Sequence, residues 1–447
     1  MFSSSPASPN RSFTASGSGN DLERFQHEKL AVLASFLIGT MAFVFVNVGG
    51  RLSIGEILCI PIGLAALLSM SMRPTRYAGW LVAATALMAA GLLVSGSMNN
   101  NSLSETQAGV ANYGVLALTA VAIASILIYT RGRALTPLIL GAAFGQVIGF
   151  YLSPTSSALI DPWKFAIGWS VNVLVLVVAW RVNKSYGRRL PGIAIGLVLA
   201  AFNVAQGSRS AGVLVALCTV AFLFVGRSHS RNQRSFVAIL AVLAVALLVA
   251  TTLYESATEN GYFGAAAAQK LADQSGNYGL IFGARKELLF LAFAFVSSPL
   301  VGWGTVARVP PEERFKAYDL LANGGYFLSS SDVERLMLVD RLPLHSVALG
   351  ALVQAGLFAL PLVILLVSLC FFAVRGVVTQ DLGFAPLFVV LSGAMHLFTS
   401  PLGDSTRIQL ALALAIGMYV VFTHKNSVER LLIKQHEQLK SPKRRFV

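Results

Sequence analysis

Long apolar runs constrain the fold of this chain more than any other feature. Stretches of about 18 residues with almost no charge recur between residues 30 and 423, near the length that an α-helix needs to cross a hydrocarbon core of ~30 Å. With 55% hydrophobic and 12% charged residues among 447, the chain also has too few polar side chains to cover a water-soluble globule of its size. The pattern therefore predicts an all-α polytopic membrane protein.

We expect about twelve transmembrane helices. The apolar runs cover residues 30–48, 53–70, 77–95, 109–130, 134–152, 163–180, 190–205, 210–226, 235–253, 345–373, 384–400 and 405–423. The chain then divides into a disordered cytoplasmic tail (1–29), spans one to nine (30–253), an extracytoplasmic loop (254–344), spans ten to twelve (345–423) and a basic cytoplasmic tail (424–447). The first tail is rich in Ser, Gly, Pro and Asn, a composition typical of disorder.

The basic residues predict the orientation. Lys and Arg concentrate in short cytoplasmic loops, whereas acidic residues contribute little to topology. With the amino terminus inside, the short inner loops hold twelve cations and the short outer loops hold four. The outer four are Arg51, Lys164, Arg209 and Arg407. The net charge of +14 is therefore mainly a topology signal with anionic lipid as its partner, and it does not indicate nucleic acid.

One long polar segment interrupts the apolar pattern. Residues 254–344 hold ten of the twenty acids of the chain and eight basic residues, and the orientation places them outside. A connection of this length is usually functional. Within it, Glu287–Gly304 reads "ELLFLAFAFVSSPLVGWG", which predicts a short re-entrant or interfacial helix that ends near Pro299 and turns at Gly302 and Gly304.

Three basic side chains open predicted helices at the outer face. Arg209 follows the predicted helix cap Ser208, Arg285 opens the loop helix, and His345 opens the tenth span. A helix start with an adjacent arginine suits phosphate oxygens. Each residue also has a simpler interpretation: Arg209 reaching lipid phosphates, Arg285 on a solvated face, and His345 as an interfacial histidine. The functional interpretation depends on their occurring together.

The sequence contains no recognisable metal or disulfide motif. Cys59, Cys218 and Cys370 all lie inside apolar runs, which favours packing roles. There is no Asp-x-Asp pair, and the first outer loop offers only Glu56. We therefore expect no metal and no cofactor. Six polar residues inside the spans are interpreted as helix-packing hydrogen-bond formers: Glu56, Gln146, Asn172, Asn203, Gln354 and His396.

Four strings resemble a known family in their order and spacing. They are "GSRSAG" at 207–212, "GARKELL" at 283–289, "SPLVGWG" at 298–304 and "HSVALGALVQAGLFALPLVILL" from His345. Together they resemble the O-antigen ligase and Wzy-type polysaccharide polymerase family of the membrane C-type glycosyltransferase superfamily. The match covers residues 204–373. Ser346 stands where the family commonly has Asn, and Ser210 where it has Gly.

The resemblance implies an enzyme of the bacterial inner membrane. It would transfer glycan from an undecaprenyl-diphosphate carrier to a sugar hydroxyl on the outer face, with other polysaccharide assembly proteins as further partners. Arg209 and Arg285 would bind the diphosphate with Ser208, and His345 would be the essential histidine. Trp303, Asp404 and Arg407 are candidate acceptor or sugar contacts, although Asp404 and Arg407 are also well placed for a local ion pair. Glu287 would orient Arg285 or favour its helix start, and we favour the second.

These residues support an inverting transfer without a metal. Two arginines could stabilise the leaving diphosphate, and a neutral His345 could take the proton from the acceptor hydroxyl. We favour a polysaccharide polymerase over an O-antigen ligase that would use lipid A core as acceptor. A transporter or flippase is the main alternative from another class, since twelve spans are common there, and a non-catalytic assembly scaffold is a third.

Overall fold

The described part of the chain is mainly helical. In this computed structural model, it comprises residues 18–47, 51–69, 76–187, 190–225, 252, 255–262, 264–274, 285–326 and 328–440. Six helices in this part are long and apolar enough to cross a membrane, and five shorter apolar helices accompany them. The chain is therefore an all-α protein with several potential membrane spans. The predicted ninth span, 235–253, lies almost entirely outside the described residues.

The first half of the bundle carries one small hairpin and two short helical turns. Its elements are α1 (Ser18–Met41), β1 (Phe45–Asn47), β2 (Arg51–Ser53), α2 (Ile54–Leu68), α3 (Arg76–Met98), α4 (Leu103–Tyr129), α5 (Leu135–Leu152), α6 (Ser156–Ile160), the π-helical turn η1 (Trp163–Ile167), α7 (Gly168–Tyr186), α8 (Leu190–Ala205) and α9 (Arg209–Val225). The two strands pair antiparallel, with Val46 opposite Leu52.

The remaining elements form the long polar segment and the last part of the bundle. They are α11 (Ala265–Gln274), α13 (Lys286–Ser297), α14 (Pro311–Asn323), α15 (Ser330–Val333), the π-helical turn η2 (Glu334–Leu338), α16 (Val347–Ala355), the 3₁₀ turn η3 (Gly356–Ala359), α17 (Leu360–Thr379), α18 (Phe384–Thr399) and α19 (Asp404–Lys440). The predicted loop helix is thus α13, which ends two residues before Pro299.

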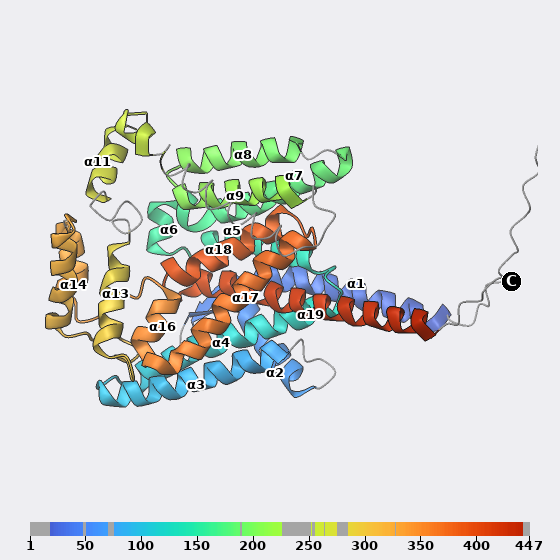
Figure 1. Ribbon diagram of the computed structural model, residues 1–447, viewed down its shortest axis with the longest axis horizontal. Helices are drawn as coiled ribbons and strands as arrows, with labels where there is room; N and C mark the ends of the chain where they lie inside the picture. Colours follow the sequence, from blue (N-terminus) through green and yellow to red (C-terminus); the bar gives the residue numbers. More distant parts are fainter. Residues whose placement is uncertain are drawn as a thin grey trace, which may run out of the picture.

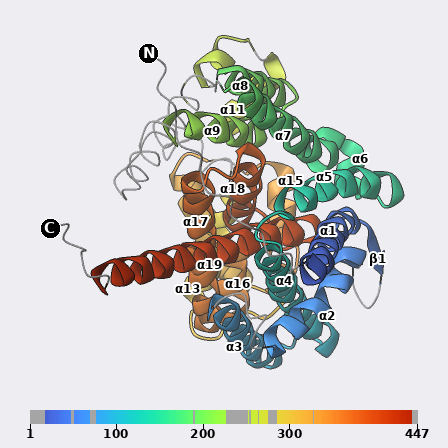
Figure 2. The same cartoon turned by 90° about the vertical axis from the view of Figure 1, so that its right-hand side faces the viewer.

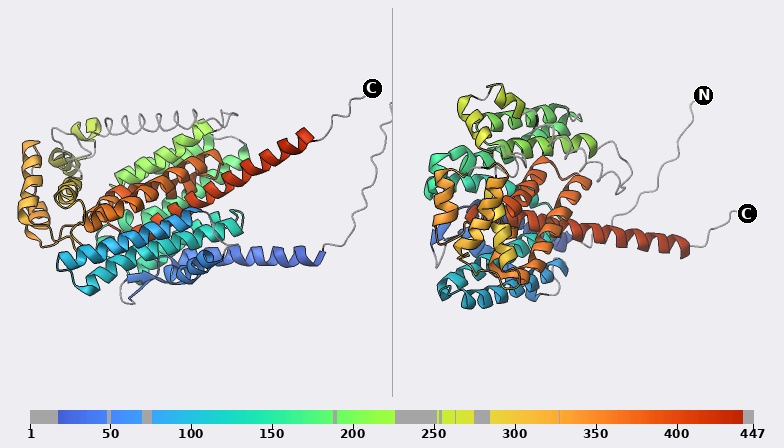
Figure 3. Two further views of the ribbon diagram at one scale, coloured as in Figure 1. Left: turned by 60° about the horizontal axis from the view of Figure 1, so that its bottom comes forward. Right: turned by 60° about the vertical axis from the view of Figure 1, so that its left-hand side comes forward.

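The bundle has two distinct ends. The helices α11, α13 and α14 lie together at one end, while the amino-terminal part of α1 and the carboxyl-terminal part of α19 extend from the other (Figures 1 and 3). We call these the loop end and the tail end. The helices α13 and α14 run across the bundle axis and cover the loop end (Figure 1).

Three sequence predictions require correction at their boundaries. The tail 1–29 was predicted to be disordered, but α1 already begins at Ser18. The first predicted span was residues 30–48, but the helix ends at Met41, because Phe45–Asn47 form β1 and pair with β2. The basic tail also does not begin as a separate segment, since α19 continues from the apolar region to Lys440.

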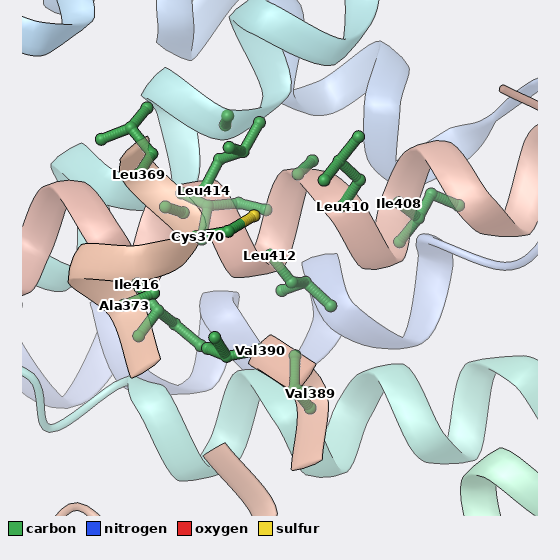
Figure 4. Packing of buried hydrophobic residues seen from close by; sticks show 14 of the residues in the cluster. Leu369, Cys370, Ala373, Val389, Val390, Ile408, Leu410, Leu412, Leu414 and Ile416 are labelled. Carbon is green, nitrogen blue, oxygen red and sulfur yellow. The ribbon is translucent and has the colours of Figure 1, made fainter. Parts of the chain in front are cut away.

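The helix α19 forms the centre of the bundle. It packs against α4, α17 and α18 (Figure 2). In its most apolar stretch of 18 residues, 83% of the residues are buried inside the protein. Small and branched apolar side chains from the three last helices fill most of this contact. Figure 4 shows Leu369 and Cys370 of α17 and Val389 of α18 close to Leu412 and Leu414 of α19. Cys370 is a packing residue here, and Cys59 and Cys218 are buried in the same core.

A glycine ladder joins α1 to α5. Gly141, Gly145 and Gly149 are spaced four residues apart, so they share one face of α5. A Cβ atom at Gly141 or Gly145 would lie 2.1 Å from a backbone oxygen of α1, and one at Gly149 would lie 2.1 Å from the oxygen of Phe43, just past the end of α1. Only glycine therefore permits this approach, which is the usual way that helices pack closely in a membrane.

Candidate functional site

Three segments of the chain meet at the loop end. The start of α13 contributes Arg285 and Glu287, η2 contributes Arg335, and the residue before the cap of α16 is His345. The helices α13 and α16 pack against each other, so residues sixty positions apart become neighbours. The sequence predicted two of these four residues, Arg285 and His345, as parts of one site.

His345 is held in contact with an arginine. Its Nε2 lies 3.3 Å from Nη1 of Arg335. An arginine can only donate hydrogen bonds, so Nε2 must accept and the imidazole is neutral with its proton on Nδ1. Burial lowers the pKa of His345 below its usual 6.5. The charge of Glu287 opposes this shift, while those of Arg335 and Arg285 reinforce it. A lowered pKa leaves the imidazole unprotonated at neutral pH.

Arg335 and Arg285 differ in how their charges are balanced. Arg335 pairs with Glu287 at 2.5 Å and with Asp332 at 3.1 Å. Arg285 is half-buried at the cap of α13 and forms no ion pair with any carboxylate in the described part of the chain. Its charge nevertheless acts on His345 and also on His396 of α18. The site therefore contains one cation, Arg285, that has no carboxylate partner in the described part of the chain.

Glu287 takes the helix-start role that the sequence favoured, and its carboxylate does not pair with Arg285. It lies in the first turn of α13, as expected for a favourable helix start, but its Oε1 accepts from Arg335. No sequence signal marked Arg335, because its contact with His345 forms only when the long segment folds back. Arg314 fixes that return: its buried guanidinium donates to the carbonyls of Val309 and Asp340, both at 2.9 Å, and to that of Val339. Burial lowers the pKa of Arg314.

Ser346 has a structural role beside the histidine. Its hydroxyl accepts the Leu349 amide at 3.1 Å and so caps α16, and it donates to the Leu397 carbonyl of α18 at 3.2 Å. Asn is as good a helix cap as Ser. The departure from the family pattern at this position therefore preserves the cap.

The glycine-tryptophan segment docks α13 onto a break between α16 and α17. Trp303 and Gly304 donate their amides to the carbonyls of Val353 and Gln354, at 2.7 and 3.0 Å. Gly302 and Gly356 have φ angles of +81° and +58°, which side chains disfavour. The indole of Trp303, predicted as a sugar contact, donates instead to the Ala294 carbonyl at 2.7 Å. Its polar atom is therefore engaged in packing α13.

Ser208 and Arg209 belong to another helix start. The amides of Gly207 and Ser208 bond to the carbonyls of Val204 and Asn203, which is the pattern of a glycine-terminated helix, and Gly207 has φ +75°. Ser208 is buried, and Arg209 is half-buried as the first residue of α9. This helix packs against α18. The charges that act on His345 are Glu287, Arg335 and Arg285, so the structure joins Arg285 to His345 without placing Arg209 in that group.

Asp404 and Arg407 do not form the local ion pair that their spacing suggested. Arg407 is 1% exposed and clamps Glu56 of α2, with Nε to Oε1 at 2.5 Å and Nη2 to Oε2 at 2.9 Å. It also donates to Asn112 at 2.7 Å and to the carbonyl of Arg51 at 3.1 Å. A buried carboxylate attracts a guanidinium more strongly than an exposed one does, so Arg407 pairs with Glu56 and not with the partly exposed Asp404. Arg407 is thereby withdrawn from any sugar contact.

Asp404 pairs with a residue of the hairpin. Its Oδ2 lies 3.1 Å from Nε of Arg51, and both side chains remain partly exposed. Glu56 is therefore more than a simple packing residue, because its carboxylate joins α2 to α19. It also completes the capping box of α2 by accepting the Ser53 amide at 2.9 Å.

A second histidine lies near the candidate site. His396 contacts Ser400 Oγ with Nδ1 at 2.8 Å and Gln409 Oε1 with Nε2 at 2.9 Å. It joins α18 to α19, in agreement with the packing role expected for it. In the described residues, no group of three His, Cys, Asp or Glu side chains has the arrangement of a metal site.

Comparisons of the chain with protein-family models, with curated proteins and with solved structures gave no match.

Proposed function

We propose that this protein is a bacterial inner-membrane glycosyltransferase that polymerises a cell-surface polysaccharide. The donor would be glycan on undecaprenyl diphosphate, and the acceptor a sugar hydroxyl on another lipid-linked repeat. One observation carries this proposal: Arg285, a half-buried cation without a carboxylate partner in the described chain, acts through its charge on the neutral imidazole of His345. A diphosphate supplies the missing negative charge, and a neutral imidazole can accept a proton.

The chemistry follows from these two groups. The acceptor oxygen forms a bond to the anomeric carbon while the bond from that carbon to the diphosphate oxygen breaks. The diphosphate leaves with the electron pair, and its growing negative charge is stabilised by Arg285. His345 takes the proton of the acceptor hydroxyl. Attack opposite the leaving group inverts the anomeric centre.

Arg335 controls the availability of the base. In the structure its Nη1 occupies the lone pair of His345 Nε2. The acceptor hydroxyl must replace that contact before proton transfer. Glu287 and Asp332 retain Arg335 when it moves, since both already pair with it.

The location follows from the charge distribution. The loop end would face the outside of the inner membrane, and both termini would lie in the cytoplasm. The short loops that the sequence assigns to the cytoplasm hold twelve cations and those that it assigns to the outside hold four, as the positive-inside rule requires. Arginine charge takes the place of a metal in this proposal, so transfer should continue in EDTA.

Replacement of His345 and Arg285 tests the proposal. Purified protein would be given lipid-linked repeat units, and chain extension would be followed by electrophoresis of the labelled glycan. His345→Ala should reduce transfer by at least about 10²-fold, the contribution typical of a general base. Arg285→Gln should reduce it to a similar degree and also weaken donor binding. Arg308→Gln is the matched control, because Arg308 lies in the same segment and pairs with Glu105 at 3.3 Å.

Full activity of His345→Ala would contradict the general-base role. Activity that EDTA abolishes and a divalent ion restores would contradict the metal-free assignment. A deletion strain distinguishes the other functions: single repeats on lipid outside the membrane support a polymerase, and single repeats inside support a flippase. An O-antigen ligase would instead leave polymerised glycan on its lipid carrier.

A further inference from the structure

A cavity with both polar and apolar lining opens at the loop end, away from His345. It has a volume of about 70 Å³ and lies between the β1–β2 hairpin, the ends of α5 and η1, and the start of α19. Polar side chains and aromatic rings both line it, among them Arg51, Gln146, Ser153, Asp404, Phe45 and Phe165. None of these residues belongs to the group around His345.

Two polar atoms in this cavity lack hydrogen-bond partners. The side chain of Gln146 is buried in α5, with 7% of the residue exposed, and its Oε1 is unpartnered. Ser153 Oγ at the end of the same helix is also buried and unpartnered. The sequence had suggested that Gln146 forms a helix-packing hydrogen bond, but Oε1 forms none. Buried polar atoms normally have partners, so these two indicate a ligand that brings hydroxyl groups.

The charges of the cavity cancel each other. Arg51 pairs with Asp404 at 3.1 Å and donates to the Ser153 carbonyl at 3.0 Å, and its guanidinium lies 5.0 Å from the ring centre of Phe45. A neutral ligand therefore suits this cavity better than an anion does. Aromatic walls add an apolar surface beside the polar atoms. A pyranose ring has the same combination, with hydroxyl groups at its edge and C–H groups on its face.

We propose that this cavity binds a neutral sugar ring through Gln146 and Ser153. Its volume admits several water molecules, or the hydroxyl-bearing edge of one ring. Asp404 and Ser405 place the cavity at the start of α19, and Gln409, five residues further along this helix, contacts His396. The assignment of the sugar to the acceptor glycan rests on the proposed transfer reaction. The glycerol of a phosphatidylglycerol headgroup offers the same vicinal hydroxyls.

Saturation-transfer NMR on the full chain in phosphatidylcholine nanodiscs tests the proposal. The probes are the methyl pyranosides of glucose, galactose and mannose, together with N-acetylglucosamine. At least one should give ring-proton signals with the wild-type protein. Gln146→Leu should weaken its binding about fivefold, the effect of one lost hydrogen bond. Ser153→Ala should weaken sugar binding to a similar degree. It provides the test if Gln146→Leu fails to fold.

Two matched controls identify the cavity. Gln380→Leu makes the same change at the tail end, where Gln380 bonds to Thr423 at 2.9 Å. Ser97→Ala removes an exposed hydroxyl of α3 that bonds to the Val94 carbonyl. Both controls should bind the sugar as the wild type does. His345→Ala should also retain sugar binding, so a failure of the transfer mechanism would be seen separately.

Three results would overturn the proposal. One is the absence of signal from every probe, which would leave the cavity to water. Another is unchanged binding in both Gln146→Leu and Ser153→Ala. The third concerns the source of the hydroxyls: loss of sugar binding in nanodiscs that contain phosphatidylglycerol would assign the cavity to lipid headgroups and not to glycan.

Discussion

The protonation state of His345 depends on two neighbours with opposite charges. Glu287 raises the pKa of the imidazole, and Arg335 lowers it while it also neutralises Glu287 at 2.5 Å. Burial has the largest influence and lowers the pKa. One arginine therefore maintains the neutral imidazole in two ways, by its own charge and by its hold on the carboxylate.

Replacing Arg335 should raise the pKa of His345. Arg335→Gln removes a cation that lowers the pKa and releases the carboxylate of Glu287 that raises it, so both changes have the same sign. Diethyl pyrocarbonate reacts with neutral imidazole, and mass spectrometry of the peptide that contains His345 would give its rate at each pH. The rate should fall at a higher pH in Arg335→Gln than in the wild type. Any general-base activity should likewise begin to fall at a higher pH in Arg335→Gln than in the wild type.

Two further variants serve as controls for this prediction. Arg335→Lys keeps the charge, so its pH profile should stay close to that of the wild type. Arg308→Gln changes a cation of the same segment that does not act on His345, and should have no effect. An unchanged or downward shift in Arg335→Gln would refute the electrostatic account.

At the level of elements, glycine determines how closely helices approach. The ladder on α5 lets the carbonyls of Phe36 and Thr40 on α1, and of Phe43 just after it, come into contact with α5. Close approach at this contact also positions the end of α5, which carries Gln146 and Ser153 of the cavity. The break at Gly356 has a similar effect, because it lets the Gly302–Gly304 turn dock on the end of α16.

Adding one methyl group to the ladder should destabilise the protein. In Gly145→Ala the new Cβ would lie 2.1 Å from the Thr40 carbonyl oxygen, so the two helices must move apart. Overpacking of this kind costs about 1–3 kcal/mol. Thermal unfolding in detergent, followed by a thiol-reactive dye, would measure the loss, because Cys59, Cys218 and Cys370 are all buried until the protein unfolds.

Gly114→Ala is the control for the ladder. It lies in α4 with open space around its Cβ position, and alanine favours a helix by about 0.5–1 kcal/mol over glycine. The midpoint temperature of thermal unfolding of Gly114→Ala should equal or exceed that of the wild type. If Gly145→Ala unfolds at the same midpoint temperature as the wild type, then α1 and α5 are packed less tightly than in the structure.

At the level of the whole molecule, the polar segment covers one end of the bundle and both described termini extend from the other (Figure 3). This polarity agrees with the distribution of basic residues between the short loops. In the proposed orientation, the loop end faces the outside and the tail end faces the cytoplasm. Both candidate sites lie at the loop end.

Cysteine labelling in intact cells should reveal this orientation. The three native cysteines would first be replaced. Tyr262→Cys lies at the loop end at a residue that is 81% exposed, and should react with a membrane-impermeant maleimide. Tyr186→Cys lies at the tail end at a residue that is 72% exposed, and should react only after lysis. Labelling of Tyr186→Cys in intact cells would reverse the proposed orientation.

The sequence by itself determined the helical class, most helix positions and the short loop helix. Hydropathy, proline and glycine act over a few residues, so their effects can be recognised locally. The exceptions arose at boundaries, as at Met41, where strand pairing with a later segment ended a helix that the apolar run would have continued.

Only the tertiary structure decided which charged groups meet. Arg407 pairs with Glu56, 351 residues away, and Arg335 reaches His345 only because the polar segment folds back across the bundle. The unpartnered oxygen of Gln146 likewise became visible only when the helices around it were packed. Coulomb energy depends on distance and burial, and neither quantity can be obtained from separation along the chain.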